Sequence, residues 1–347
     1  MRYSKQVTLG YDKYGNRVRK RIYADSKIEL TVKEADLIRG FDSAPSRVTF
    51  GEYAREWLDI YKDSRELSTK EMYEVALRKT KPIADMKLQT IKQADLQKLI
   101  NKHKAHPYAC HKLNLLLTQV FQRARKDGLV RDDPSEDLEL PPKEEKEERV
   151  LTEEEKKAIK TADLTKEERF YVEMLYYCGL RPQEVFALMV SDFDFKKNLV
   201  RIRKAVSYDK GQPFIKTTKT RKQRSVPVPT AFVPKVKSFI KDIKAQNSLY
   251  LMHLNGELYS KSQRTALWYE IKKKINVALG GNDNLDLTNS LHPYTFRHTF
   301  CVSCYYMRIS VKKTAELMGN SPQVVLKTYT HLDNSREPLD DLAKMIL

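Results

Sequence analysis

The sequence predicts a multidomain, mainly α-helical protein with small β-sheets. At about 150 residues per domain, 347 residues suffice for two or three domains. Apolar residues follow helical spacing over most of the chain, and strand-like alternation is confined to two short regions. A charged stretch without apolar periodicity, Pro141–Arg149, is typical of a linker. We therefore expect an N-terminal module at 1–46, a helical bundle at 47–140, a linker at 141–150 and an α+β domain at 151–347.

The N-terminal module is predicted to be a β-hairpin followed by a helix. Gln6–Tyr11 and Arg17–Tyr23 alternate as strands do, and Tyr14–Asn16 between them has the composition of a turn. Ile28–Arg39 has the pattern of a short helix. Residues 1–22 carry seven basic side chains and one acidic one, so the sheet is basic and suits contact with DNA.

The bundle at 47–140 is predicted from apolar residues that recur at helical spacing. Gly128 and Pro134 mark the end of the last helix. The four predicted helices cover residues 50–61, 69–79, 91–102 and 109–126.

The third domain opens with a capping box, in which Thr152 precedes a helix and Glu155 follows three residues later. Helices are expected at 152–162, 165–179 and 182–190, and again over most of 231–347. Between them, alternation predicts strands at Leu199–Val206, Pro213–Lys216 and Gln223–Val228, with a turn at Asp209–Gly211.

Composition narrows the class of protein. Hydrophobic residues make up 41% of the chain, which excludes a disordered basic tail. There are 64 Lys and Arg against 46 Asp and Glu, a net charge of +18, so a polyanion such as nucleic acid is the first expected partner; a generally basic protein is the alternative. Four cysteines fit a reducing compartment. No run of about 18 apolar residues exists, so we expect a cytoplasmic protein with no membrane span.

Several familiar reactive sites are missing from the sequence. There is no Gly-rich phosphate loop and no set of Cys-x-x-Cys pairs. His103, His106, Cys110 and His111 could be argued into a zinc site, but their spacing matches no standard zinc finger. We therefore expect neither a metal nor a cofactor, and a metal-free reaction on phosphate needs fixed cations, a nucleophile and a proton donor.

Two basic segments offer such cations. Arg181 follows Gly179 at a helix end, and Glu184 one turn later could orient it for a bidentate grip on phosphate; an ordinary salt bridge at a helix start is the alternative. The segment 201–224 holds nine basic residues and one acid. Most of its charges are expected to contact the phosphate backbone, and one lysine could act as a general acid. The charges near its second turn belong to Lys216, Lys219, Arg221, Lys222 and Arg224.

In four ordered boxes the third domain resembles the tyrosine recombinases, the phage-integrase family. The boxes are Cys178-Gly179-Leu180-Arg181-Pro182-Gln183-Glu184, Thr218-Lys219-Thr220 before Val226-Pro227, Phe296-Arg297-His298-Thr299-Phe300, and Leu317-Met318-Gly319 followed by Tyr329-Thr330-His331. The resemblance implies that 151–347 is an α+β catalytic domain and 47–140 a core-binding bundle. It also implies that 1–46 is an arm-type DNA-binding module, as in a phage or integrative element.

The resemblance implies a site-specific recombinase that cuts and rejoins double-stranded DNA through a covalent 3′-phosphotyrosine. Arg181 and Arg297 match the arginines that hold the scissile phosphate, and Tyr329 matches the nucleophile. Lys219 matches the lysine that protonates the leaving 5′-oxygen, with Lys216 as the competing choice. Partners implied are core and arm attachment sites and further copies in a DNA-bound homotetramer. An excision factor and a host DNA-bending protein are possible additional partners.

Two positions depart from the family's pattern. Tyr294 stands where the family commonly has histidine. Asn320 stands where the family commonly has histidine or tryptophan. Both can hydrogen-bond phosphate, but neither is an imidazole acid or base near neutral pH. We expect both in the active site with altered roles; core packing and helix capping are the alternatives. Whether His292, two residues before Tyr294, takes the place of the family's histidine is open.

Two other functions remain open at this point. A type IB topoisomerase would share the chemistry but only relax DNA, and a DNA-binding regulator could have kept the fold and lost the activity. The apolar spacing in Leu339–Leu347 predicts a short helix that docks either on its own domain or on a neighbouring subunit.

Overall fold

The computed structural model describes residues 3–11, 17–41, 48–143, 149–217, 223–288 and 290–333. The chain forms two compact units, Met1–Glu145 and Lys146–Leu347. The finer division into a module, a bundle and a linker stays a prediction. In the described part of the chain, no helix is long and apolar enough to cross a membrane. The C-terminal segment Leu339–Leu347 and Lys219 lie outside the described residues.

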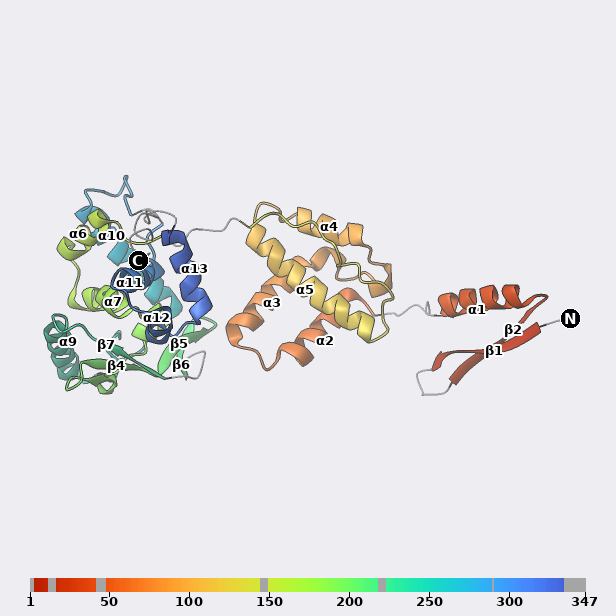
Figure 1. Cartoon of the computed structure of the whole chain (residues 1–347), viewed down its shortest axis with the longest axis horizontal. Coiled ribbons are helices and arrows are strands. Elements are labelled where there is room, and N and C mark those ends of the chain that lie inside the picture. The colour runs from red at the N-terminus through yellow and green to blue at the C-terminus, as the bar shows by residue number, and fades with distance from the viewer. Residues whose placement is uncertain are drawn as a thin grey trace, which may run out of the picture. The chain divides into compact units, whose positions relative to one another are not determined.

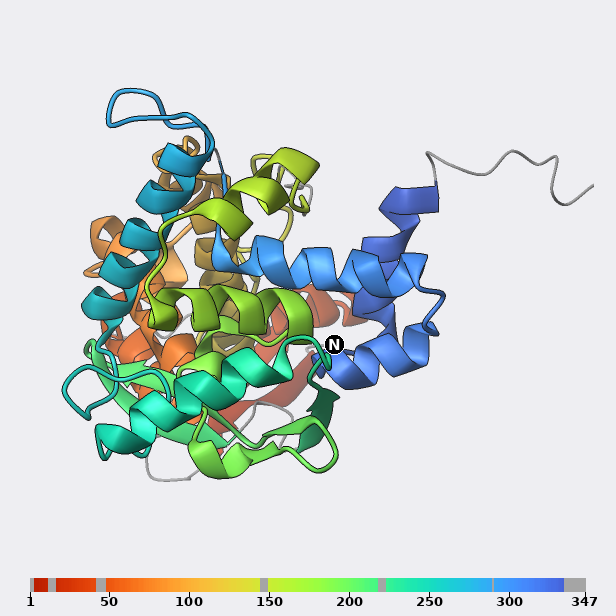
Figure 2. The same cartoon turned by 90° about the vertical axis from the view of Figure 1, so that its left-hand side faces the viewer.

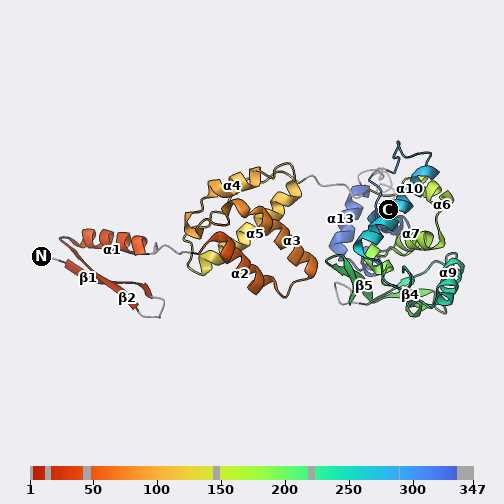
Figure 3. The same ribbon diagram turned by 180° about the vertical axis from the view of Figure 1, so that it is seen from behind.

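The N-terminal hairpin and helix are confirmed. Strands β1 (Tyr3–Tyr11) and β2 (Arg17–Ala24) pair antiparallel, and helix α1 (Lys27–Phe41) packs against both of them (Figures 1 and 3). The Lys5 ammonium lies 2.7 Å from the Glu34 carboxylate of α1, so Lys5 faces the helix. Because side chains alternate along a strand, the neighbours of Lys5 face the other way.

The predicted four-helix bundle is also confirmed. Its longest helix, α5 (Pro107–Lys126), is central: its inward residues, Leu113 to Phe121 at helical spacing, are completely buried. The Cys110 thiol donates to the His103 carbonyl oxygen rather than meeting the histidine rings. No cluster of three metal-binding side chains occurs among the residues described. The helices are α2 (Phe50–Lys62), α3 (Leu67–Lys79), α4 (Gln93–Asn101) and α5 (Pro107–Lys126), with 3-10 turns at Lys81–Ile83 and Leu88–Thr90.

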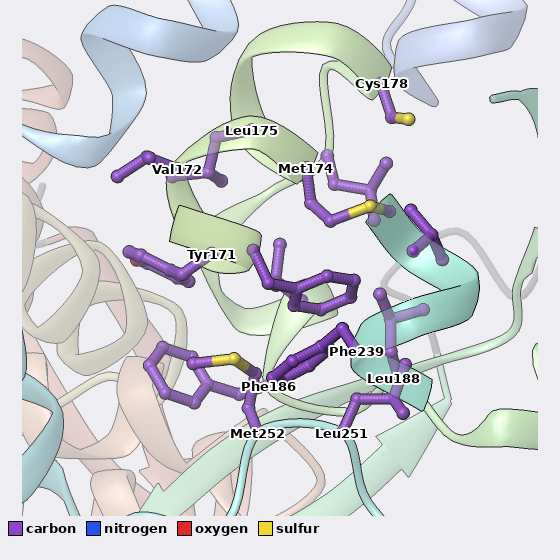
Figure 4. Close-up of a cluster of buried hydrophobic side chains, with 14 of the residues drawn as sticks. Tyr171, Val172, Met174, Leu175, Cys178, Phe186, Leu188, Phe239, Leu251 and Met252 are labelled. Atoms are coloured by element: carbon purple, nitrogen blue, oxygen red, sulfur yellow. The ribbon is translucent and has the colours of Figure 1, made fainter. Parts of the chain in front are cut away.

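The second unit is built around helix α7 (Lys166–Cys178). Figure 4 shows Tyr171, Met174 and Leu175 of α7 within a cluster of buried apolar side chains. Helix α11 (Pro293–Tyr306), blue in Figure 2, packs along the yellow-green α7. The predicted capping box opens the preceding helix: Glu155 N–H donates to the Thr152 hydroxyl over 3.2 Å. The other helices are α6 (Glu153–Thr161), α9 (Val233–Ala245), α10 (Lys261–Ala278), α11 (Pro293–Tyr306), α12 (Val311–Met318) and α13 (Pro322–Asp333).

The strands of this unit form two small antiparallel sheets, and one predicted strand is divided between them. The expected strand Leu199–Val206 is broken at Arg203, whose guanidinium is held by the Asp192 carboxylate. Its first half joins a three-stranded sheet and its second half joins a hairpin with Lys210 and Gly211 at the turn. The sheets are β3 (Phe193–Asp194), β4 (Leu199–Ile202) and β7 (Arg224–Pro227), and separately β5 (Lys204–Asp209) with β6 (Gln212–Thr217).

The predicted helix at 182–190 is wrong in length. Helix α8 covers only Pro182–Val185. Beyond it, the Leu188 carbonyl accepts from Leu251 N–H over 2.9 Å and Met189 bridges to Tyr250, so tertiary backbone pairing replaces the helical hydrogen bonds. A 3-10 turn, Val190–Asp192, then leads into β3. The apolar run that suggested a helix is buried here from all sides.

Candidate active site

The site begins where α7 ends. Gly179 terminates the helix with φ of 61°, a left-handed conformation that favours glycine. A β-carbon there would lie 2.2 Å from the Phe300 ring, so the chain can pass α11 this closely only at a glycine. Two residues later Arg181 precedes α8, where Pro182 is favoured at the first helical position. The helix end and the helix start together fix the backbone of Arg181.

A buried carboxylate holds two arginines. Glu184 is 2% exposed and accepts from both terminal nitrogens of Arg224, at 2.8 and 2.6 Å. It also accepts from Arg181, through the backbone N–H at 2.8 Å and Nη1 at 3.0 Å. Burial alone would raise the pKa of Glu184, but the hydrogen bonds and charges of Arg224, with the charge of Arg297, outweigh burial and lower it. Glu184 is therefore an anion at neutral pH, and it orients Arg181 as expected.

Arg297 approaches from α11. It is 2% exposed, and its guanidinium donates to the Gly179 and Met318 carbonyl oxygens, the latter over 2.6 Å. Burial, with the positive charge of Arg181, lowers the pKa of Arg297 to about 9. At neutral pH the group is still a cation.

Three arginines share the C-terminal end of α12. The carbonyl oxygens of three successive residues each accept from a different guanidinium: Leu317 from Arg224 at 2.8 Å, Met318 from Arg297 at 2.6 Å and Gly319 from Arg181 at 2.7 Å. These carbonyls lack helical partners, and cations are favourable at a helix C-terminus. The side chains therefore fix the turn that leads from α12 into α13.

Asn320 joins two of these arginines. Its side-chain oxygen accepts from Nη2 of Arg181 at 2.6 Å and from Nη2 of Arg297 at 3.1 Å. The structure thus brings together three of the predicted site residues. The cluster contains three guanidinium groups and one carboxylate, 3 − 1 = +2, and the Arg181 side chain is 31% exposed. A partly open site with this excess of positive charge suits an anion that can accept several hydrogen bonds.

Tyr329 lies on α13 and is directed elsewhere. It is 5% exposed, its ring lies 4.9 Å from that of Tyr305, and its hydroxyl is 3.1 Å from the Thr314 hydroxyl. Burial raises the pKa of Tyr329. The phenol is therefore protonated in this conformation, and its hydrogen bond goes to α12 rather than to the arginines.

Tyr294 is near the cluster but takes no part in its hydrogen bonds. It is 38% exposed, and its hydroxyl is 3.4 Å from the Gln183 side-chain oxygen. His292 instead starts α11: its backbone N–H donates to the Thr295 hydroxyl over 3.3 Å. The expectation that Tyr294 belongs to the catalytic set stays a prediction. Of the two hairpin lysines, Lys216 lies on β6 and pairs with Ala205, half-buried.

Two residues of the site escaped the sequence interpretation. Arg224 was expected to be one of several phosphate-backbone contacts, but its side chain is 10% exposed and bonded to Glu184. The alternation around Val226, which is buried on the same strand, places Arg224 on the inner face and could have identified it. Thr314 carries no comparable signal, because it is one of four buried residues of α12 and has no charged side chain.

Comparison with known proteins identifies the family of the chain. The model of the phage integrase family matches residues 148–336, and that of the phage integrase N-terminal SAM-like domain matches residues 49–103. The chain belongs to the phage integrase family. The mainly helical fold with small sheets is confirmed, as is the resemblance to tyrosine recombinases, whose members catalyse site-specific cleavage and rejoining of DNA.

Alignments with related proteins cover most of this integrase-family chain. A XerC-like tyrosine recombinase of Caldanaerobacter subterraneus subsp. tengcongensis is 24% identical over 389 residues, covering 98% of this chain and 96% of that protein. The XerD recombinase of Staphylococcus epidermidis is 28% identical over 226 residues, 62% of this chain and 68% of that one.

Solved structures share the fold. The Tn1549 transposon integrase in complex with a circular intermediate DNA has a TM-score of 0.71 at 18% identity, covering 86% of this chain and 98% of that one. A lambda integrase tetramer bound to a Holliday junction has a TM-score of 0.64 at 14% identity, covering 94% and 93%.

The pairing of Arg224 with Glu184 should be a major source of stability in the second unit. Arg224→Gln removes one partner of a buried ion pair and is expected to reduce the free energy of unfolding by about 3 kcal/mol. Arg224→Lys should restore little of this free energy, because an ammonium group cannot donate two parallel hydrogen bonds to a carboxylate as a planar guanidinium does. Urea denaturation of the full chain measures both. The matched control is Arg201→Gln on β4, whose surface pair with Asp194 should contribute about 0.5 kcal/mol or less.

This contribution should depend on pH with a definite sign. Since the folded-state pKa of Glu184 is lowered, the stabilisation is complete above the unfolded-state pKa of about 4.3 and is lost as acid protonates the folded carboxylate. The difference between wild type and Arg224→Gln should therefore shrink at acid pH. Equal losses for the two glutamine variants at neutral pH would show that Arg224 is not the anchor.

Proposed function

We propose that this chain cleaves and rejoins double-stranded DNA at specific sites to integrate and excise a mobile element, with Tyr329 as the nucleophile. The observation that carries the proposal is the cluster in which Arg181 and Arg297 converge on one oxygen acceptor beside a turn leading to Tyr329. Two converging guanidinium groups are suited to the non-bridging oxygens of a phosphate. Their fixed charge would stabilise the extra negative charge of a pentavalent transition state.

The proposed reaction exchanges one phosphate ester for another. The Tyr329 oxygen forms a bond to the scissile phosphorus as the phenol gives its proton to a solvent water molecule. The bond from phosphorus to the 5′-oxygen breaks, and Lys219 gives that oxygen a proton, leaving a 3′-phosphotyrosine and a 5′-hydroxyl. Because the protein–DNA link keeps the phosphodiester energy, rejoining needs no ATP. Attack requires the Tyr329 hydroxyl to leave Thr314 first, since Tyr329 is buried and its hydroxyl is hydrogen-bonded to Thr314 of α12.

Exchange of strands between two duplexes uses four such active sites, so the proposal includes a homotetramer on DNA. The lambda integrase tetramer on a Holliday junction, which shares this fold, supports that assembly. An excision factor and a host DNA-bending protein belong to the same proposal. Tyr294 would hydrogen-bond the phosphate or the nucleophile from the rim of the site, in line with its exposed position.

A nicked duplex carrying the element's own junction sequence tests the proposal. Wild-type protein should become covalently attached to the 3′ side in the presence of EDTA, as a shifted band on a denaturing gel. Tyr329→Phe should bind the duplex with unchanged affinity and form no adduct, because it lacks the attacking oxygen. The control is Tyr306→Phe, at an exposed tyrosine on α11, which should form the adduct normally.

The same assay separates the rival functions. DNA binding by the wild type without any adduct would favour a regulator that has lost activity. Adduct formation with plasmid relaxation, but without strand exchange between two sites, would favour a topoisomerase.

A substrate with sulfur in place of the bridging 5′-oxygen should identify the general acid. A thiolate leaves without a proton, so the substitution rescues only a variant that lacks the proton donor. We expect Lys219→Ala to cleave the oxygen substrate roughly 100-fold more slowly than wild type and the sulfur substrate at nearly the wild-type rate. Lys216→Ala should show no selective rescue. Single-turnover rates measure both, and rescue of Lys216→Ala alone would reverse the assignment.

The N-terminal module is proposed to bind arm-type DNA sites through the open face of its hairpin. A two-stranded β-ribbon fits the major groove of DNA. Lys5 and Val7 alternate toward α1, which leaves the intervening side chains on the other face. All of those intervening side chains are exposed: Ser4, Gln6, Thr8, Arg19, Arg21 and Tyr23. Polar groups flanked by two arginines can both read bases and contact phosphates.

Replacing both Arg19 and Arg21 by alanine should weaken binding to arm-site DNA and spare the core site. If both contact phosphates, the slope of log affinity against log salt should fall by about two at the arm site. Titrations of each labelled duplex at several salt concentrations measure this. A control that removes Lys27 and Lys33, exposed on α1, should leave the slope unchanged. Equal weakening at arm and core sites contradicts a dedicated arm-binding face.

A further inference from the structure

Asn320 occupies an unusual position for a neutral side chain. Its oxygen accepts from one terminal nitrogen of Arg181 and one of Arg297, at 2.6 and 3.1 Å. Both neighbours are donors only, so the amide nitrogen cannot take the place of the oxygen. A single oxygen thus lies between the two guanidinium groups that are proposed to grip the scissile phosphate.

The backbone around Asn320 is held in a defined conformation. Gly319 closes α12 with φ of 65°, and Asn320 N–H donates to the Ala315 carbonyl over 3.0 Å. A β-carbon at Gly319 would lie 3.0 Å from Nη1 of Arg224, so the turn sits directly on the arginine cluster. In this turn the side chain of Asn320 lies between the two guanidinium groups.

The donors that Asn320 uses are those that an incoming phosphate oxygen needs. Nη1 of Arg181 is held by Glu184, and the Arg297 guanidinium is otherwise directed at the Gly179 and Met318 carbonyls. The donor pair aimed at one common point is the pair that meets at Asn320. A phosphate oxygen bound by both arginines would have to occupy that point.

We propose that the Asn320 side-chain oxygen stands in for a non-bridging phosphate oxygen in the DNA-free protein, and that the phosphate displaces it on binding. Identifying that phosphate as the scissile one rests on the proposed function. The stand-in keeps both arginines aligned while no DNA is bound. It yields to phosphate because a neutral amide leaves the cluster's excess charge of +2 uncompensated, whereas an anionic oxygen compensates it.

A groove beside Asn320 can accommodate the displaced side chain. Asn320 is half-exposed and borders a groove of about 730 Å³ between β7 and α12, which is also lined by Ser225, Lys312 and Ser321. Polar side chains there can receive the amide after it leaves the arginines.

The proposal predicts opposite effects for two substitutions. Asn320→Asp places a carboxylate between the arginines, which should raise Tm by roughly 2–4 °C and weaken phosphate binding about tenfold or more. Asn320→Ala removes the competitor and should bind phosphate about threefold or more tightly than wild type, at the cost of a lower Tm. A residue that only supports the fold would instead lose Tm and phosphate affinity together.

The measurement uses the full-length chain without DNA and inorganic phosphate as the probe. Phosphate affinity is obtained by calorimetric titration, and Tm by thermal unfolding without phosphate. The control is Gln323→Glu, which adds the same charge change at an exposed position on α13 and should alter phosphate affinity less than twofold. Weaker phosphate binding by Asn320→Ala than by wild type, or unchanged binding by Asn320→Asp, overturns the proposal.

Cleavage of the nicked duplex separates this proposal from the proposed function. If the order of phosphate affinities is as expected but the wild type forms no covalent adduct, the stand-in remains and the recombinase proposal fails. If the adduct forms but the order of affinities is reversed, the recombinase proposal remains and the stand-in fails.

Discussion

The buried carboxylate of Glu184 is the interaction on which the rest of the site depends. It is 2% exposed and is bound by Arg224 from β7 and Arg181 from the start of α8. Without it, guanidinium groups would face one another in a poorly solvated place, where like charges repel strongly. One anion therefore allows cations to gather, and it leaves an excess of positive charge for an anion brought from outside.

The same cations also support the backbone. Successive carbonyls at the end of α12 accept from Arg224, Arg297 and Arg181, in place of the helical hydrogen bonds that a helix end lacks. The turn they hold leads into α13 and the proposed nucleophile. Structure and proposed chemistry are thus coupled: the groups that would bind phosphate are those that position the segment carrying Tyr329. Tyr329 itself is hydrogen-bonded to Thr314 of α12.

The two departures from the family pattern have different structural consequences. Asn320 lies inside the arginine cluster and binds two of its members, whereas Tyr294 lies at its exposed rim and contacts Gln183. An amide can accept from both arginines at once, which a ring nitrogen in its donor form cannot do. Asn320 is therefore suited to a position between two guanidinium donors.

The sequence by itself determined most of the helices and the N-terminal hairpin, and it predicted the phosphate-binding residues, because periodicity, capping residues and motif order are local properties of the chain. It also located Arg181 and Glu184 at one helix start, three residues apart. Only the tertiary structure decided that α8 stops at Val185, that the strand after Leu199 divides between two sheets, and that Arg224 pairs with Glu184. These outcomes depend on contacts between residues distant in the chain: backbone pairing with Leu251, sheet partners, and a carboxylate 40 residues earlier.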